Sequence, residues 1–495
     1  MATADVAPAP SMGSMFQVSV VNKKQEGNIS AFWKSLNGDK EDALPKRYSD
    51  LKKKLVSTPE AERSLVEGWR SILASLKENN PKWAAKGVDN IPQVNYEDLI
   101  EGDNNSAVAK AIRECGNVVI KGAVDQETAL AWKEGIREYI KKNPGVKGFP
   151  AHDPQVFELY WTPSQIAART HPRLVSLVVR MNELWDASPS AEISRRNPIF
   201  YADRCRERHA GDTSFALGPH SDSGTIERWE NESYSSCYRD GIIENWETWN
   251  PWNIDGRVKA NTDMYDSPGG SSVFRTFQGW LGLSHTGPGE GTLRVHPSVK
   301  HATAYFWMRP FFSPIKTEEE CATRDEYLDV DNWRLDLEST AFPGSPPGRG
   351  QEFSDATHPH LEVNKVITSI PRVEPGDFVF WHCDGIHAVE AKHGGTGDSS
   401  VMYIGAAPLT AGNAEYLAQQ RATFLSGVPP PDYPGGKGES GFIGRPTDKD
   451  LKSPEARRGM GFEKFVAAEN ATEGEQIVIR AANDILGLTE NKINI

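Results

Sequence analysis

The spacing of apolar residues changes along the chain and divides it into helical and strand-rich parts. After Thr58, a capping residue, Pro59 suits a first helical position, and apolar residues then recur every three or four positions. This spacing predicts a long amphipathic helix. Its apolar face comprises Leu65, Trp69, Ile72, Leu73 and Leu76.

A β-α unit follows. The run "NVVIKGAV" predicts a short buried strand, and Asp125 is placed to cap the helix "QETALAWKEGIREYIKKNP", which stops at Pro144. One side of this helix is apolar, with Trp132, Ile136, Tyr139 and Ile140. The segment "QIAARTHPRLVSLVVRMNELW" predicts further helix.

From about residue 195, short apolar runs alternate with Gly, Pro and Asp turns, which predicts an antiparallel sandwich or barrel. Residues 224–270 and 311–365 are predicted to be long loop insertions, and helix returns after about residue 410. The aromatic run after Thr303 is predicted to be a core strand in which Tyr305 or Trp307 contacts a co-substrate. The predicted strands are "PIFYADRCRER", "SVFRTFQGWLGLS", "GTLRVHPS", "TAYFWMRPFF", "DFVFWH" and "SVMYIGAAP".

Composition narrows the functional classes. The 495 residues carry a net charge of −13, which disfavours general affinity for nucleic acid or an anionic membrane. No apolar run reaches the roughly 18 residues of a membrane span, and the N-terminus does not resemble a secretory signal. Five cysteines without a CxxC pair favour a reducing compartment. We therefore expect a cytoplasmic protein that acts on a small molecule; its oligomeric state is not predicted.

Histidines and carboxylates gather in two segments. His220 and Asp222 are alternate residues after a predicted strand, so both side chains are expected on one face. His387, in "EPGDFVFWHCDGIHAVE", is the expected third ligand of a facial triad of two histidines and a carboxylate. His382 is the rival of His387, and Cys383 is a weaker candidate. The pattern is typical of non-haem Fe(II) oxygenases, in which three open positions admit O2 and a co-substrate.

Several motifs resemble the phytanoyl-CoA hydroxylase-like branch of the Fe(II)/2-oxoglutarate oxygenases. They are Gly376-Asp377 followed by an apolar strand and His387, the segment "GPGEGTLRVHPSVKH", and the entry strand "VVIKGAV". "YADRCRER", "LGPHSDSGTIERW" and "YIGAAPLTAGNAEYLAQQRATFLSG" resemble recurring segments of its YbiU-like fungal and bacterial members.

The resemblance implies a double-stranded β-helix and the oxidation of an unactivated C–H bond with Fe(II), 2-oxoglutarate and O2. It also implies that His220, Asp222 and His387 are the iron ligands. Because relatives that transfer halide lack the carboxylate, Asp222 implies hydroxylation, desaturation or cyclisation instead.

One feature of the family is missing. A basic residue normally follows the second histidine by 8 to 16 positions and binds the distal carboxylate of 2-oxoglutarate, but residues 388–420 contain no arginine. Lys392 is too close to His387 for that role. Arg275 and then Arg294 are the predicted replacements, since a guanidinium can bind a carboxylate bidentately. Without such a residue, the protein would be a 2-oxoglutarate-independent iron oxidase.

Further residues are predicted to contact the substrate. Arg204 and Arg206, followed by Arg208, alternate on one strand before His220 and could bind a carboxylate. Trp229, beside Glu227 and Arg228, is expected to close the pocket. The predicted substrate is a small metabolite such as an amino acid or another carboxylate. A non-catalytic, cupin-like metal- or ligand-binding protein is the remaining alternative.

We therefore expect one α+β domain, a double-stranded β-helix (a cupin-like jelly roll) between two helical layers. Its predicted parts are a flexible arm at residues 1–45, a helical layer with the entry strand at 46–195, the catalytic core at 196–410, and a helical cap at 411–495.

Overall fold

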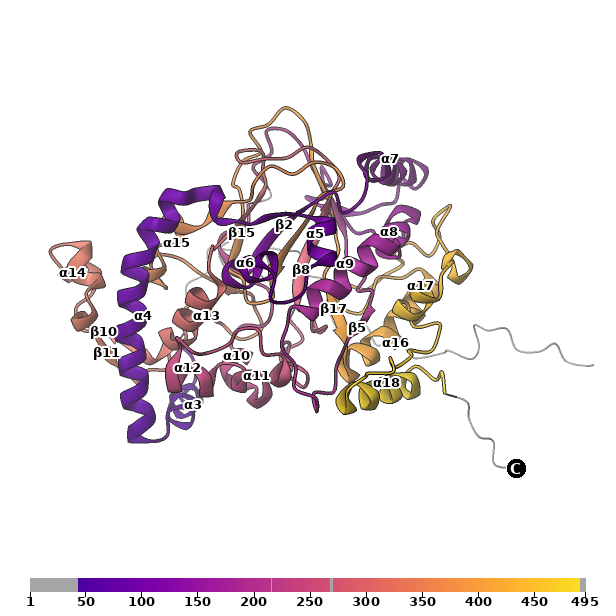
Figure 1. The fold of residues 1–495 in the computed structure, drawn as a ribbon. Coiled ribbons are helices and arrows are strands. Elements are labelled where there is room, and N and C mark those ends of the chain that lie inside the picture. The colour runs from indigo at the N-terminus through magenta and orange to yellow at the C-terminus, as the bar shows by residue number, and fades with distance from the viewer. Residues whose placement is uncertain (1–42, 215, 268–269, 490–495) are drawn as a thin grey trace, which may run out of the picture.

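A computed structural model of the protein describes residues 43–214, 216–267 and 270–489. The predicted arm, residues 1–45, therefore falls almost wholly outside the described residues. Figure 1 shows a mixed arrangement of helices and strands in which long helix α4 runs along one side and α16 to α18 gather on another.

The helix predicted after Thr58 is confirmed as α4 (Pro59–Lys86). The Thr58 hydroxyl accepts a hydrogen bond from the Ala61 backbone N–H, and all five predicted apolar residues are buried. Trp69 stacks on Phe312 with ring centroids 4.3 Å apart, so this helix packs against the segment that follows residue 310.

Most strands lie in two larger sheets. The first has the order β1-β2-β14-β8-β16-β6-β4-β3, and the second has the order β12-β7-β15-β9-β13. In the first sheet, in chain order, the strands are β1 (Gln93–Asn95), β2 (Asn117–Lys121), β3 (Gly148–Phe149), β4 (Val156–Phe157), β6 (Cys205–Arg208), β8 (Phe277–Gly282), β14 (Phe378–His382) and β16 (Ser399–Tyr403). In the second they are β7 (His220–Ser221), β9 (Leu293–Val295), β12 (Gln351–Glu352), β13 (Thr368–Ser369) and β15 (His387–Val389).

The two sheets pack face to face. One buried cluster joins Trp280, Val379 and Val401 of the eight-stranded sheet with Leu293 and Val295 of the five-stranded sheet. Alternate residues of each strand point to this shared interior, as expected from the two-residue period of a β-strand. The interior between the sheets therefore receives side chains from segments far apart in the sequence.

Helices cover the outer face of the eight-stranded sheet. Its outward-facing residues, such as Ile120, Leu281 and Phe378, share a buried cluster with Leu99 and Leu177 of the N-terminal helices. The predicted Asp125 cap is confirmed, because its carboxylate accepts the Thr128 N–H. These helices are α5 (Tyr96–Glu101), α6 (Ala107–Cys115), α7 (Gln126–Lys142), α8 (Pro163–Arg169) and α9 (Pro172–Glu183).

The C-terminal part packs on the short pair β5 (Ser194–Ile199) and β17 (Ala407–Leu409). Its helices are α16 (Ala411–Ser426), η8 (Asp448–Asp450), α17 (Pro454–Gly459) and α18 (Glu473–Ile485). Strands β1 and β2, which fall in the predicted helical layer, belong to the same sheet as β8 and β14 of the predicted core.

The predicted strand "TAYFWMRPFF" is wrong. Most of this run belongs to helix α13 (Val299–Met308), which is buried on nearly all sides and packs on α4. A short segment that is apolar all round carries no periodicity to separate a buried helix from a buried strand. Tyr305 and Trp307 lie in the core around α4 and do not contact the central cavity described below.

The two predicted loop insertions contain regular structure. Residues 224–270 form α10 (Glu227–Glu230), α11 (Glu232–Ser236), α12 (Arg239–Asn245) and η3 (Asp255–Arg257). Residues 311–365 contain β10 (Phe312–Pro314), η5 (Glu318–Glu320), α14 (Arg324–Leu328), η6 (Val330–Asn332), β11 (Trp333–Leu335), η7 (Pro359–Leu361) and α15 (Val363–Val366), besides β12. The remaining elements are α3 (Arg47–Leu55), η2 (Gly87–Asn90) and η4 (Arg309–Phe311).

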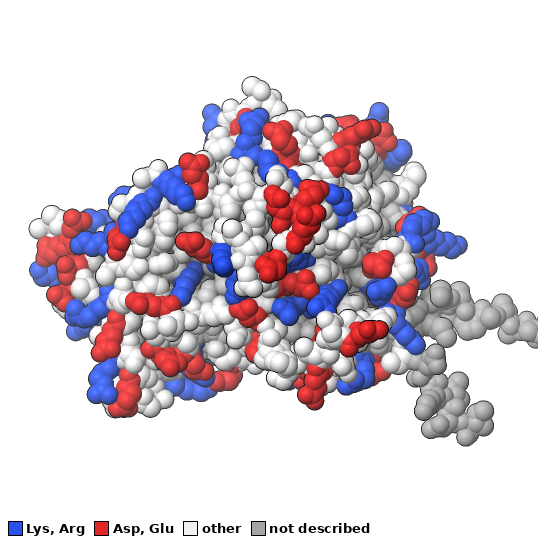
Figure 2. Space-filling view, viewed as in Figure 1, with Lys and Arg blue, Asp and Glu red and all other residues white. Residues whose placement is uncertain are grey.

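Two surface properties complete the description. None of the helices in the described ranges is long and apolar enough to cross a membrane. On the face shown in Figure 2, acidic and basic side chains are intermixed, without a broad region of one sign.

Candidate metal centre

Adjacent strands of the five-stranded sheet bring His220, Asp222 and His387 together. His387 on β15 pairs directly with His220 on β7, and their ring centroids lie 4.1 Å apart. Asp222, just after β7, has one carboxylate oxygen 3.6 Å from His220 Nε2 and the other 3.2 Å from His387 Nε2. An ion with three ligand bonds of about 2.1 Å at right angles holds ligand atoms about 3 Å apart. The three side chains therefore fit a single ion.

Backbone carbonyls orient both imidazoles. His220 Nδ1 lies 2.7 Å from the Gly218 carbonyl oxygen, and His387 Nδ1 lies 3.0 Å from that of Gly385. A carbonyl only accepts hydrogen bonds, so each Nδ1 is the donor and each Nε2 is the nitrogen left to bind a metal. Burial, and then His387, lowers the pKa of His220 to about 4. At neutral pH His220 is therefore an uncharged imidazole, the form that binds metals.

Asp222 stays ionised in this position. Burial disfavours its carboxylate, but the two neighbouring histidines and the Arg275 guanidinium outweigh that cost and hold the pKa of Asp222 below its usual range. The centre thus offers two imidazole nitrogens and one anionic oxygen.

The centre opens on a cavity of about 870 Å³ between the sheets, with His220, Asp222 and His387 in its wall. The three side chains occupy one side of a prospective ion and leave the other side facing this space. Their geometry suits a metal that binds further ligands, because a closed structural site would surround the ion with protein atoms.

A second group, His382, Cys383 and Asp384, also has its potential ligand atoms close together. Two buried guanidinium groups already hold Asp384, with Arg228 Nη1 and Arg257 Nη2 each 2.5 Å from a carboxylate oxygen. The His382 Nδ1 accepts the Asp384 N–H at 3.0 Å. Because these positive charges repel a cation and the atoms already have partners, we do not assign a metal to this group.

The two predicted 2-oxoglutarate anchors lie in different places. Arg275 lines the cavity, and its guanidinium carbon lies 5.2 Å from the ring centre of Tyr201. Arg294 does not line the cavity; it donates a hydrogen bond of 2.8 Å to the Ile367 carbonyl. Strand alternation is the reason, since Leu293 and Val295, its neighbours on β9, face the interior. Of the two predicted anchors, only Arg275 therefore lies in the cavity wall.

Some of the predicted substrate-binding residues lie in the cavity wall and others do not. Arg204 and Arg206 both line the cavity, whereas Arg208 is fully buried in an ion pair with Asp212 at 2.8 Å. Trp229 lies outside the cavity wall. It is buried in the cluster around α4, where its indole N–H donates to the Trp307 carbonyl at 3.0 Å.

Several residues of the cavity wall escaped the sequence prediction. Gln278 and Trp280 are alternate residues of β8, and Trp381 lies opposite Gln278 on β14. The two-residue period of "FQGWLG" could have indicated the first two. The wall also includes Phe149, Tyr160, Tyr201 and Tyr403.

The C-terminal Pro/Gly-rich segment also reaches the cavity through Asp432 and Tyr433. Asp432 accepts hydrogen bonds from the Tyr201 hydroxyl at 3.0 Å and the Ser272 hydroxyl at 2.7 Å. The Tyr433 ring lies 4.7 Å from that of Tyr160, measured between centroids. No local pattern in "PPPDYPGG" indicates such long-range contacts.

Known proteins are similar to this chain in sequence and fold over most of its length. A family model described as Gig2-like matches residues 42–462. The uncharacterized protein YbiU of Escherichia coli strain K12 is 32% identical over 386 residues, which span 75% of this chain and 85% of YbiU. This relative confirms the predicted resemblance to the YbiU-like proteins.

Solved structures of related proteins are also similar to this chain. The structure of GlcNAc Inducible Gene 2, GIG2 (DUF1479), from Candida albicans has a TM-score of 0.81 at 32% identity, covering 91% of this chain and 96% of that one. A Salmonella typhimurium LT2 protein, named there as a candidate oxidoreductase, has a TM-score of 0.70 at 31% identity, covering 85% and 99%.

Proposed function

The chain belongs to the Gig2-like family, and from that premise we propose that it is an oxidoreductase, specifically a non-haem Fe(II)/2-oxoglutarate-dependent oxygenase. The reaction would be hydroxylation, desaturation or cyclisation at a C–H bond of a small metabolite. The name of the Salmonella typhimurium relative supports the broader class.

The observation that carries the proposal is the geometry of His220, Asp222 and His387. Two imidazoles and one carboxylate lie on one side of a position that opens on a cavity of about 870 Å³. A facial set of this composition is the usual ligand set of non-haem Fe(II) oxygenases.

The order of the strands supports a double-stranded β-helix. From β6 to β9 the chain alternates between the two larger sheets, and from β13 to β16 it does so again. The resulting orders, β6-β16-β8-β14 and β7-β15-β9-β13, suit a jelly roll of eight antiparallel strands. The metal centre would then sit between neighbouring strands β7 and β15.

The protein groups would have distinct roles. Bound Fe(II) supplies the activation of O2, coupled to conversion of 2-oxoglutarate into succinate and CO2, that oxidises the C–H bond. His220, Asp222 and His387 would hold the ion. Arg275 would bind the distal carboxylate of 2-oxoglutarate through two parallel hydrogen bonds.

Arg204 and Arg206 would bind a carboxylate of the substrate. Buried aromatic side chains such as Trp280 and Trp381 would exclude water from the reacting groups. Ligand cavities commonly measure about 300–1,000 Å³. A cavity of about 870 Å³ thus has room for 2-oxoglutarate and a second small metabolite.

One observation favours a second candidate, a 2-oxoglutarate-independent iron oxidase. Strand β16, Ser399–Tyr403, follows His387 at the distance where the family normally carries its basic anchor, and it contains no basic residue. If Arg275 does not replace that anchor, electrons would have to come from the substrate.

The test is succinate release by the protein reconstituted with Fe(II) and 2-oxoglutarate under O2. Wild type is expected to release succinate, and Asp222→Ala to release less than about 1% as much, since it loses an anionic ligand. Asp240→Ala, which removes an exposed carboxylate, is the matched control.

The possible outcomes separate the candidates. Succinate release unchanged in Asp222→Ala would refute the proposed ligand set. Bound iron with O2 consumption but without succinate would favour the iron oxidase. Failure of wild type to retain Fe(II) would leave a non-catalytic binding protein.

A further inference from the structure

We infer that Arg228 is a positioning residue of the metal centre: its buried guanidinium ties the strand that carries His220 to the turn that precedes His387. This inference rests on the proposed metal site, but it concerns a residue that does not contact the ion. Arg228 comes from α10, in the segment between the first two ligands and β8.

The Arg228 side chain is fully buried and, besides the Tyr234 and Tyr238 hydroxyls, contacts three other parts of the chain. Its Nη2 donates to the Ser221 hydroxyl of β7 at 2.8 Å, and its Nε donates to Gln351 Oε1 of β12 at 2.8 Å. Its Nη1 donates to Asp384 Oδ1 at 2.5 Å. A planar guanidinium has five N–H donors in a fixed arrangement, so these contacts restrict the three elements together.

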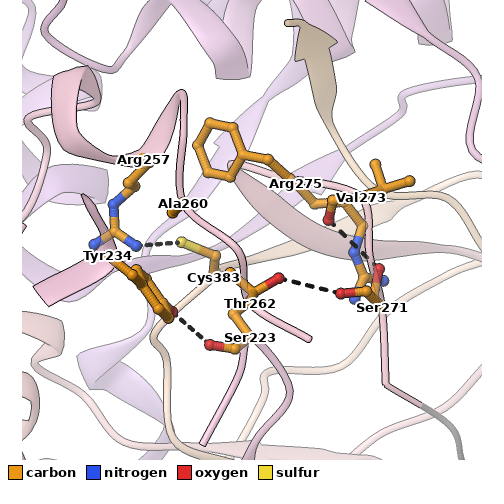
Figure 3. Close-up of a pocket in the computed structure, with 10 residues that line it drawn as sticks. Ser223, Tyr234, Arg257, Ala260, Thr262, Ser271, Val273, Arg275 and Cys383 are labelled. Atoms are coloured by element: carbon orange, nitrogen blue, oxygen red, sulfur yellow. Dashed lines mark hydrogen bonds between the residues drawn. The ribbon is translucent and has the colours of Figure 1, made fainter. Parts of the chain in front are cut away.

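The β7 end of this connection reaches both sides of Asp222. Ser221, which Arg228 contacts, lies between His220 and Asp222. On the other side, the Tyr234 hydroxyl donates to the Ser223 carbonyl, as Figure 3 shows, and also accepts from Arg228 at 2.7 Å. The segment that presents the Asp222 carboxylate is therefore held on both sides, at Ser221 and at Ser223.

The other end reaches His387 through the turn before β15. Asp384 is followed by Gly385, whose carbonyl accepts the His387 Nδ1–H at 3.0 Å. The Asp384 backbone N–H is held in turn by His382 Nδ1 at 3.0 Å. Displacement of Asp384 would thus move the carbonyl that fixes the orientation and tautomer of the His387 ring.

Arg257 is the natural comparison. It pairs with the same carboxylate, its Nη2 lying 2.5 Å from Asp384 Oδ2, and it is also buried. Its other hydrogen bonds go to Cys383 Sγ, visible in Figure 3, and to the Tyr238 hydroxyl. Unlike Arg228, it donates to neither Ser221 of β7 nor Gln351 of β12. Arg257 therefore stabilises Asp384 without tying it to the ligand strand.

This difference allows a matched experiment with Arg228→Met and Arg257→Met. Each variant removes one buried guanidinium and leaves Asp384 paired with the other, so the charge change is the same. The measurements are the Kd for Co(II), the visible absorption spectrum of bound Co(II), and the thermal midpoint of the metal-free protein. Both variants are expected to lower that midpoint.

Arg228→Met is expected to raise the Kd for Co(II) about ten- to a hundredfold and to alter the spectrum, as loss of an orienting partner does at other metal sites. Arg257→Met is expected to leave the Kd within about twofold of wild type and the spectrum unchanged. Equal effects of the two variants on Kd, or no effect of either, would overturn the inference.

Ser221→Ala provides a second variant that changes no charge, in case Arg228→Met does not fold. It removes one contact of Arg228 and is expected to raise the Kd in the same direction, by about three- to tenfold. An unchanged Kd in Ser221→Ala when Arg228→Met does not fold would also overturn the inference. If wild type binds no Co(II), the proposed metal centre itself fails. If wild type binds and the variants bind equally well, only the role of Arg228 fails.

Discussion

His220 and His387 face each other directly across the β7–β15 pair, with their ring centroids 4.1 Å apart. Successive residues of a strand point to opposite faces, so a slip of one residue would turn His387 away from His220. The candidate metal centre therefore depends on the register of one short strand pair as much as on the identity of its residues.

The choice between His387 and His382 can be tested directly. His387→Ala is expected to abolish stoichiometric binding of Co(II), measured by calorimetric titration, because it removes a nitrogen from the proposed ligand set. His382→Ala is expected to retain Co(II) but to lower the free energy of unfolding by about 3 kcal/mol. The reason is packing: the His382 ring is buried and stacks on Trp185 with centroids 4.6 Å apart. Loss of Co(II) binding in His382→Ala alone would reverse this assignment.

The role of Arg275 predicts a selective change in KM. Arg275→Met is expected to raise the KM for 2-oxoglutarate about ten- to a hundredfold, since a charge-assisted pair contributes about 1.5–3 kcal/mol. Arg294→Met, which removes a guanidinium outside the cavity, is the control and is expected to leave this KM within about twofold. The measurement is succinate release as a function of 2-oxoglutarate concentration. A larger effect of Arg294→Met would contradict the assignment.

The buried carboxyl of Glu227 is expected to make the free energy of unfolding depend on pH. Burial raises the pKa of this carboxyl from 4.5 to about 7, so the folded protein binds more protons than the unfolded chain between these values. Stability contributed by the protonated group is therefore present at pH 4.5 and is lost as the pH rises to 7.

Glu227→Gln, which keeps a neutral side chain, is expected to be more stable than wild type by about 2–3 kcal/mol at pH 8. The difference should vanish near pH 4.5. Urea unfolding at both pH values measures it, and a difference independent of pH would show that Glu227 does not titrate in this range.

Gly376 is a position at which any larger residue is expected to destabilise the fold. Its φ is +94°, and an added Cβ would lie 2.3 Å from the Val124 carbonyl oxygen. Gly376→Ala is expected to cost at least about 3 kcal/mol of unfolding free energy, from backbone strain and this clash together. At Gly122, φ is +66° and an added Cβ meets none of the described atoms within 4 Å. Gly122→Ala should therefore cost only about 1 kcal/mol. Equal losses in thermal or urea unfolding would contradict the role of the clash.

Local sequence patterns were sufficient to predict the capped helices and the composition of the candidate site. Thr58 and Asp125 cap the helices predicted for them, because capping and helical periodicity involve residues within a few positions of one another. The His-x-Asp spacing likewise predicted two candidate ligands on one side, since it depends only on local backbone geometry.

Contacts between distant side chains could be found only from the folded chain. Strand pairing placed His387 beside Asp222, and the tertiary fold put Arg275 in the cavity wall and Arg294 outside it. No local pattern indicated that the largely buried α13 is a helix, or that the Tyr433 ring packs against Tyr160. Periodicity shows which residues of a segment share a face, but the neighbour of that face is set by long-range pairing and packing.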